Sequence, residues 1–215
     1  MSAARVEHTD WEGEQPDIDR RSVAMSSRVV SVSTVFFFGG FFFAFVYLRI
    51  QNVNGRWNRG DAKPSILLGG LILAASVIAV ASLLGVRGSL RSNDLLRWRA
   101  GAIVALISIL LCIVLRIVQL WTLGINPSSG GYVSVLIGWS LALVLVHIGA
   151  LYWIETLVAR SGRIVRSESD SVATASVDVA AADQRFLASA GGFTLFWCVV
   201  AAIELLAYVL LDLVR

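Results

Sequence analysis

Histidine and cysteine are scarce in this sequence, and their scarcity excludes several kinds of metal site. The 215 residues include two histidines, His8 and His147, and two cysteines, Cys112 and Cys198. Haem and copper centres that use several histidines cannot be assembled from this chain alone. The two cysteines lie far apart in sequence without CxxC spacing, so we expect them to be small buried apolar residues and not a disulfide.

Catalytic motifs are missing as well. The sequence has no glycine-rich phosphate-binding loop, no HExxH pair and no Ser, His and Asp set that could meet in one place. We therefore expect a chain that is not catalytic by itself and binds neither a metal nor another cofactor. Its net positive charge does not require nucleic acid as a partner, because arginines that flank membrane spans face anionic lipid head groups.

Charged residues make up only 15% of the chain, whereas hydrophobic residues make up 57%. This is more apolar surface than a soluble domain of this size needs. A membrane-spanning helix needs about 20 largely apolar residues to cross about 30 Å of hydrocarbon. Strand alternation is absent, and the apolar runs are too long for barrel strands. The sequence therefore predicts an all-α integral membrane bundle of five transmembrane helices, at about residues 29–50, 66–86, 100–121, 132–154 and 193–213.

The predicted bundle, residues 29–215, is preceded by a polar cytoplasmic tail, residues 1–28. Six acidic residues lie among the first nineteen positions, which is not the pattern of a cleavable signal peptide. The segment 155–192 is rich in Ser, Ala and Asp. We expect it to be a cytoplasmic loop with too little apolar surface to fold alone, either mobile or laid over a partner.

The distribution of basic residues predicts the orientation in the membrane. With five spans, the tail and the segments 86–99 and 155–192 share one side, which holds twelve of the eighteen basic residues. Cytoplasmic segments carry an excess of Lys and Arg, so the N-terminus is expected inside and the C-terminus outside. A cluster on the other side, Arg49, Arg56, Arg59 and Lys63, argues for the reverse orientation.

Aromatic residues near the span ends are expected to form interfacial belts, since one side of such a ring is apolar and the other polar. Those expected at the inner ends are Trp98, Tyr152 and Trp153, and those at the outer ends are Tyr47, Trp121 and Tyr132.

Four ionisable residues lie within the spans or at their edges. Glu155 is placed at the inner boundary, where it can reach water. His147 lies about two turns from the same boundary and is expected to form hydrogen bonds between helices. Glu204 lies near the middle of the last span, where a lone carboxylate must be protonated or paired.

Arg116, the fourth, lies about 7 to 8 Å below the outer end of its span at 1.5 Å per residue. We expect its side chain to extend along the helix and place the guanidinium at the membrane surface, near Gln119. Two alternatives remain open, an ion pair with Glu204 and a contact with a partner subunit.

Several residues also follow the order of a known family. The first span reads "FFFGGFFFAFVYLR" and closes on Tyr47 to Arg49, and a proline, Pro64, opens the second. The later matches are Ala74, Ala75 and Ser76, then Gly131, Tyr132, Ser134 and Gly138 in "GYVSVLIGW", and finally Phe196 and Trp197. From Ser31 to the C-terminus, this order resembles the five-helix form of subunit III of the haem-copper cytochrome c oxidases.

The polar positions of that family are replaced here. Its buried glutamate falls near Phe36, and its paired histidines fall at Ser140 and Leu143. Its later His and Asp fall at Cys198 and Ala201. The resemblance therefore rests on the order of the spans, their lengths and their aromatic residues.

The resemblance implies a non-catalytic subunit, itself without a metal, in the cell membrane of a prokaryote. Such a subunit packs against subunit I, which bears the haem, and belongs with subunit II to a complex of the aerobic respiratory chain. That complex carries haem and copper in its other subunits, reduces oxygen and moves protons, and subunit III holds lipids in a cleft. The residues expected to pack against lipid or another subunit are Gly39, Gly40, Phe41, Phe42, Phe43, Gly138 and Trp139.

Two other functions remain open at this point. One is a structural membrane subunit of a different energy-converting complex, and the other is a small solute carrier or its accessory chain. Co-purification of haem with the protein would distinguish the oxidase subunit from both.

Overall fold

The computed structural model describes residues 16–52, 55, 57, 64–92, 94–123, 130–170 and 176–213. Its helices are α1 (Pro16–Gln51), α2 (Ile66–Gly85), α3 (Arg87–Arg91), α4 (Leu95–Thr122), α5 (Gly131–Asp170) and α6 (Ser176–Ala207), followed by a π-helical turn, η3 (Tyr208–Leu213). No strand occurs in these described ranges. Five helical segments are long and apolar enough to cross a membrane, so the chain is an all-α, multi-pass membrane bundle, as the sequence predicts.

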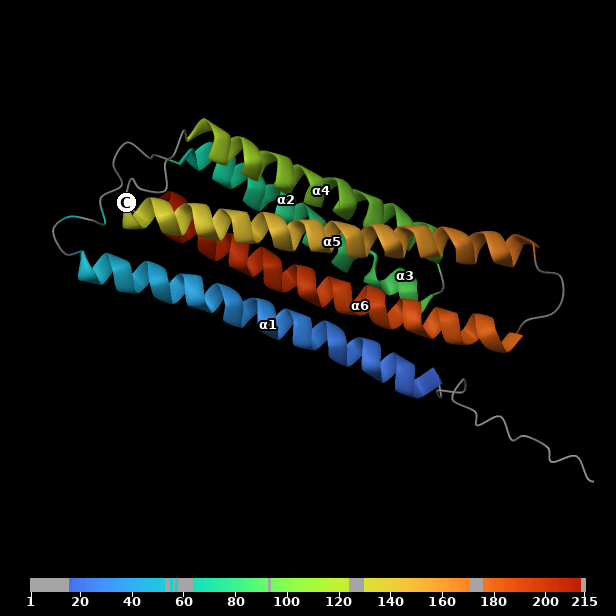
Figure 1. Ribbon diagram of the computed structural model, residues 1–215. Helices are drawn as coiled ribbons and strands as arrows, with labels where there is room; N and C mark the ends of the chain where they lie inside the picture. Colours follow the sequence, from blue (N-terminus) through green and yellow to red (C-terminus); the bar gives the residue numbers. More distant parts are fainter. Residues whose placement is uncertain are drawn as a thin grey trace, which may run out of the picture.

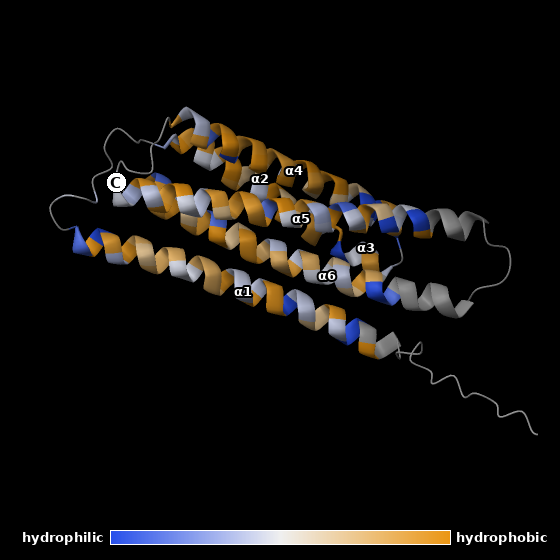
Figure 2. Cartoon of the chain, in the orientation of Figure 1, coloured by the Kyte–Doolittle hydropathy of each residue, from blue (hydrophilic) through white to orange (hydrophobic). Residues whose placement is uncertain are grey.

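Local sequence signals define where two of the spans begin. Pro64 precedes α2, and the Ser65 hydroxyl accepts a hydrogen bond from the Leu68 amide at 3.3 Å. The Asp94 carboxylate accepts one from the Arg97 amide at 3.0 Å at the start of α4. Both side chains satisfy amides that have no partner in the first turn of a helix. The apolar residues lie along the middle of the helices and the hydrophilic residues gather nearer the ends (Figure 2).

The long helices run side by side, with α1 along one edge of the bundle and α2 and α4 at the other (Figure 1). Helix α1 packs against α5 and α6, and it is the least buried of the five spans. Helices α2 and α5 each contact both α4 and α6. The space between α4 and α6 is therefore the centre of a four-helix unit, and α1 lies against its outside.

Two groups of aromatic residues fill the bundle. At one end Trp98 packs edge-to-face against Phe186, with ring centroids 4.9 Å apart. We call this the basic end, because Arg20, Arg87 and Arg97 lie there. Towards the opposite end Phe38 and Trp139 pack with centroids 5.8 Å apart.

The helices extend beyond the predicted spans. Helix α1 begins at Pro16, inside the segment predicted as a tail, and α5 runs for 40 residues to Asp170. At 1.5 Å per residue, α5 is about 60 Å long, twice the thickness of the hydrocarbon core.

The prediction that residues 155–192 form a loop without structure of their own is therefore wrong for the described part of that segment. Phe186 and Ala190 are 2% and 1% exposed and belong to the core around Trp98. Burial of these apolar side chains stabilises the extension of α6.

The predicted aromatic belts are correct only in part. Trp121 and Tyr152 are largely exposed on the bundle surface, as belt residues should be. Trp98 and Tyr132 are instead almost completely buried, 1% and 0% exposed, which contradicts the prediction. The Tyr132 hydroxyl donates to the Leu211 carbonyl at 2.6 Å, so its polar group bonds to η3 and not to the membrane surface.

Candidate functional site

A cluster of polar side chains lies in the centre of the bundle. Helix α4 contributes Arg116 and Gln119, α5 contributes His147, α6 contributes Glu204 and η3 contributes Asp212. Each of the five is at most 5% exposed. Ionisable groups at this depth are costly, and they persist only where they are paired or have a function. We call these five residues the polar cluster.

The members of the polar cluster are joined into a chain of bonds. A terminal nitrogen of Arg116 forms an ion pair with Glu204 Oε2, and its other terminal nitrogen, Nη1, donates to Gln119 Oε1 at 3.0 Å. The Gln119 amide in turn donates to Asp212 Oδ1 at 3.2 Å. The chain therefore connects the middle of α6 with its C-terminal extension η3 through side chains of α4.

His147 extends this chain to α5. Its Nδ1 lies 2.6 Å from the Leu143 carbonyl oxygen, and its Nε2 lies 3.3 Å from Glu204 Oε1. The imidazole ring stands perpendicular to the Trp197 ring, with centroids 5.3 Å apart. The Trp197 indole donates to the Ser76 carbonyl at 3.3 Å, which ties this region to α2 as well.

The expectation that Arg116 extends to the membrane surface is wrong, and the ion pair with Glu204 is present instead. The pair lies between α4 and α6, which α2 and α5 both contact, so it crosses the middle of the four-helix unit. A pattern in the sequence indicates that Arg116 faces other helices, although it does not identify Glu204 as the partner. Ser108, Cys112 and Arg116 recur at intervals of four residues and are all buried. Polar and small residues at this spacing mark the face of a membrane helix that meets other helices.

Asp212 was not among the candidates from the sequence, and Gln119 was expected only to assist Arg116 at the surface. Asp212 lies against Gly69 of α2, where an added Cβ would come 2.9 Å from the Asp212 carboxyl carbon. Gly69 therefore lets η3 approach α2 closely enough for Asp212 to reach Gln119.

The residues expected to pack against lipid or another subunit divide into two groups. Gly138, Trp139 and the partly buried Phe41 face the interior, where a Cβ on Gly138 would lie 3.0 Å from the Phe41 ring and Trp139 is fully buried. The members of the second group are exposed on the bundle surface: Gly39, Gly40, Phe42 and Phe43. The first group holds α1 on α5, and the second leaves an apolar surface of α1 open to lipid or another chain.

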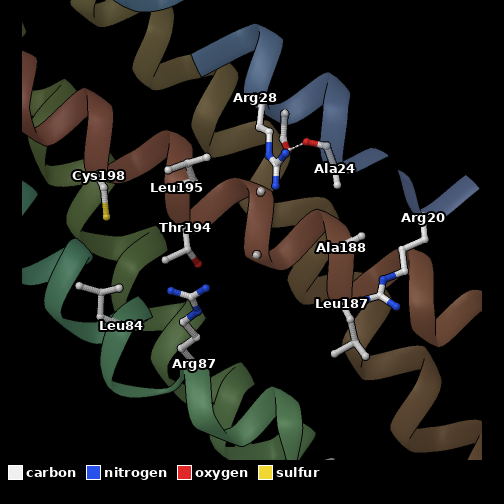
Figure 3. Close-up of a pocket in the computed structure, with 13 residues that line it drawn as sticks. Arg20, Ala24, Arg28, Leu84, Arg87, Leu187, Ala188, Thr194, Leu195 and Cys198 are labelled. Atoms are coloured by element: carbon white, nitrogen blue, oxygen red, sulfur yellow. Dashed lines mark hydrogen bonds between the residues drawn. The ribbon is translucent and has the colours of Figure 1, made fainter. Parts of the chain in front are cut away.

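A cavity of about 370 Å³ opens at the basic end between α1, α6 and the junction of α2 with α3. Figure 3 shows Arg20 and Arg28 reaching it from α1 and Arg87 from the opposite wall, with the Arg87 guanidinium beside Thr194. We call it the arginine cavity. Its other lining residues are mainly apolar or small, and no Asp or Glu is among them: Ala24, Ser27, Leu84, Leu187, Ala188, Gly191, Gly192, Leu195 and Cys198.

Cys198 is only partly buried because it lines this cavity, whereas Cys112 is buried as expected. The Cys112 thiol lies 3.5 Å from the Ile72 carbonyl, to which it donates. Both cysteines are free thiols. In the described part of the chain, no three His, Cys, Asp or Glu side chains are grouped so that they could hold a metal ion.

Comparison of the chain with protein-family models gives no match, and comparison with curated proteins gives none either.

Proposed function

We propose that the chain is a non-catalytic membrane subunit that resembles subunit III of a cytochrome c oxidase. In this role it supports an oxygen-reducing, proton-pumping complex by packing beside the haem-bearing subunit I, with subunit II as a further partner, and by holding lipid. The haem and copper belong to those partners. The observation that carries the proposal is the arginine cavity, because a subunit of this kind is expected to hold lipid in a cleft.

The chemistry of the arginine cavity suits the phosphate of a lipid. Three guanidinium groups, Arg20, Arg28 and Arg87, line it, and no Asp or Glu is among the described residues of its wall. Guanidinium groups bind phosphate through paired, charge-assisted hydrogen bonds. The apolar walls, which include Leu84 and Leu195, would lie against the acyl chains.

The exposed surface of α1 supports a role beside another membrane subunit. Phe36 and Phe43 are 77% and 68% exposed, although both lie on a helix that packs against α5 and α6 on its other side. Large aromatic side chains contribute strongly to contacts between proteins. We propose this surface of α1 as the contact with subunit I.

A solute carrier is a weaker proposal for this chain. Arg116 and Glu204, both deeply buried, are paired with each other and so are not arranged to receive a charged solute. A structural subunit of a different energy-converting complex shares all of these features, and only its partners would distinguish it.

We also propose an orientation of the bundle in the membrane. The basic end, with Arg20, Arg87 and Arg97, is placed on the cytoplasmic side of a prokaryotic cell membrane, following the excess of basic residues there. A reporter that is active only outside the cell should be active when fused after Arg215 and silent when fused after Ser171. The opposite result would reverse the orientation and leave the five spans unchanged.

Purification tests the assignment directly. The tagged full-length chain is extracted from its native membrane in a mild detergent, and the absorbance of reduced minus oxidised haem is recorded. We expect haem to co-purify in proportion to the tagged chain. A chain that purifies alone, or with partners that contain no haem, would refute the oxidase assignment.

Lipid binding is measured on the same preparation as phospholipid phosphorus per chain. The variant with Arg20→Gln, Arg28→Gln and Arg87→Gln should retain less phospholipid than the unchanged chain. The matched control replaces three exposed arginines at the same end that do not line the cavity: Arg97→Gln, Arg160→Gln and Arg163→Gln. Equal lipid retention in the two variants would show that the cavity does not select a lipid.

A further inference from the structure

The imidazole of His147 lies between two oxygen atoms that both accept hydrogen bonds. On one side is the Leu143 carbonyl, 2.6 Å from Nδ1, and on the other is Glu204 Oε1, 3.3 Å from Nε2. A carbonyl oxygen can only accept, and an ionised carboxylate can only accept. A neutral imidazole has one N–H, so it can donate to one of these oxygens and not to both.

In neither tautomer can a neutral His147 donate hydrogen bonds to both oxygens. With the hydrogen on Nδ1, the lone pair of Nε2 faces the lone pairs of Glu204 Oε1, and both atoms are buried without a hydrogen-bond partner. With the hydrogen on Nε2, the lone pair of Nδ1 faces the Leu143 carbonyl at only 2.6 Å. Two facing acceptors in a buried site are destabilising, and separations of 2.6 and 3.3 Å leave no room for a water molecule between them.

One additional proton removes this conflict. We propose that His147 and Glu204 together bind one proton, held between Nε2 and Oε1, in the centre of the membrane bundle. The proton makes either an imidazolium that donates to the carboxylate or a carboxylic acid that donates to the imidazole. On release, the bond to the proton breaks, the electron pair stays on the nitrogen or oxygen, and the proton passes to water.

The charges around the site are consistent with this proton. From α4, Arg116 pairs with Glu204, and the Cys112 thiol lies on the same face. From η3, Asp212 contributes a second carboxylate through Gln119. The groups that face the His147–Glu204 pair therefore include a cation and a second carboxyl group, so the proton binds in a part of the bundle that is already polar.

Of the described helices that also pack in this region, α1 and α2 bring no ionisable residue to the middle of the bundle. Helix α2 contains no ionisable residue, and α1 contains none between Arg28 and Tyr47. The bound proton therefore connects α5 to α6, because the contact between His147 and Glu204 depends on it. This inference does not depend on which complex the chain belongs to.

Nitrogen NMR of histidine tests the site. The full-length chain carries two histidines, so the variant His8→Gln leaves His147 as the only histidine signal. The ring is labelled with ¹⁵N, the chain is placed in lipid nanodiscs at pH 7, and the protonation of both ring nitrogens is read from their shifts. Infrared spectra of the same sample show whether a protonated carboxyl band is present and whether Glu204→Gln removes it.

Either of two results supports the proposal, an imidazolium, or a neutral imidazole with a protonated carboxyl band that is lost in Glu204→Gln. A neutral imidazole without such a band would overturn it. Glu155→Gln is the matched control, because Glu155 is an exposed carboxylate on α5, and this change should leave both spectra unchanged. If Glu204→Gln does not fold, Asp212→Asn makes the assignment: a carboxyl band that persists in Asp212→Asn and in Glu155→Gln supports the proposal, and a band lost in either contradicts it unless the imidazole is charged.

Discussion

The ion pair between Arg116 and Glu204 predicts a strong energetic coupling between two residues that are 88 positions apart. Their side chains are 5% and 2% exposed, so neither charge can be solvated when the other is removed. Loss of one partner of a buried ion pair costs about 3 to 5 kcal/mol, chiefly because the remaining charge is left without compensation. We expect a loss of this size in the free energy of unfolding for Arg116→Leu, and a smaller one for Glu204→Gln, in which the amide can still accept from the guanidinium.

The double variant should lose less stability than the sum of the single variants. With both charges removed, neither member of the pair is left without its partner, and we expect a coupling energy of about 2 kcal/mol, within the range for residues in one network. The measurement is reversible unfolding of the full-length chain in mixed micelles with increasing denaturing detergent, followed by tryptophan fluorescence. The sequence contains seven tryptophans, several of them in the core, so the signal reports on the whole bundle.

A matched cycle at the basic end provides the control. Arg97→Leu and Glu155→Gln change the same residue types at exposed positions, and each should alter stability by less than about 0.5 kcal/mol, additively. Additivity of Arg116→Leu and Glu204→Gln to within about 0.5 kcal/mol would refute the pairing. In that case the polar cluster would not connect α4 with α6.

Three further changes test the packing of the bundle. Phe186→Ala should destabilise the chain by about 3 to 5 kcal/mol, because it opens a cavity beside Trp98, whereas Phe36→Ala on the exposed face of α1 should have little effect in the same unfolding assay. Gly192→Ala should cost about 1 to 3 kcal/mol, since its Cβ would overlap a serine of α1, while Gly191→Ala meets nothing within 4 Å; equal effects would contradict this helix contact. Tyr132→Phe removes the hydrogen bond to η3 and should cost about 1 kcal/mol; an unchanged unfolding midpoint would show that the bond does not contribute.

The five spans could be predicted because each depends on its own residues. A continuous apolar run such as 66–86 can satisfy its backbone in a membrane only as a helix, whatever its neighbours are. The ends of the helices were predicted less well than the spans, because they depend on tertiary contacts. The residues before Phe193 have a polar composition, but Phe186 packs against Trp98 of α4, and this contact extends α6 beyond the apolar run.

The polar cluster, too, could be predicted only in part from the sequence. The sequence indicates the depth of Arg116 and Glu204 and predicts that a carboxylate at that depth is protonated or paired. It cannot indicate which helices are neighbours across the bundle, so an extended Arg116 side chain and an ion pair both remained possible. The packing of α2 and α5 against both α4 and α6 decided between them.

The sequence by itself thus determined the number of membrane-spanning helices and the positions of Arg116 and Glu204 along them, because these depend on local hydropathy and on 1.5 Å of rise per residue. Only the tertiary structure decided which faces of the helices meet. It placed Trp98 and Tyr132 in the interior, brought Asp212 to Gln119, and set His147 between the Leu143 carbonyl and Glu204. The physical reason is that these contacts join helices distant in the chain, and their geometry follows from close packing and from the need to pair every buried charge.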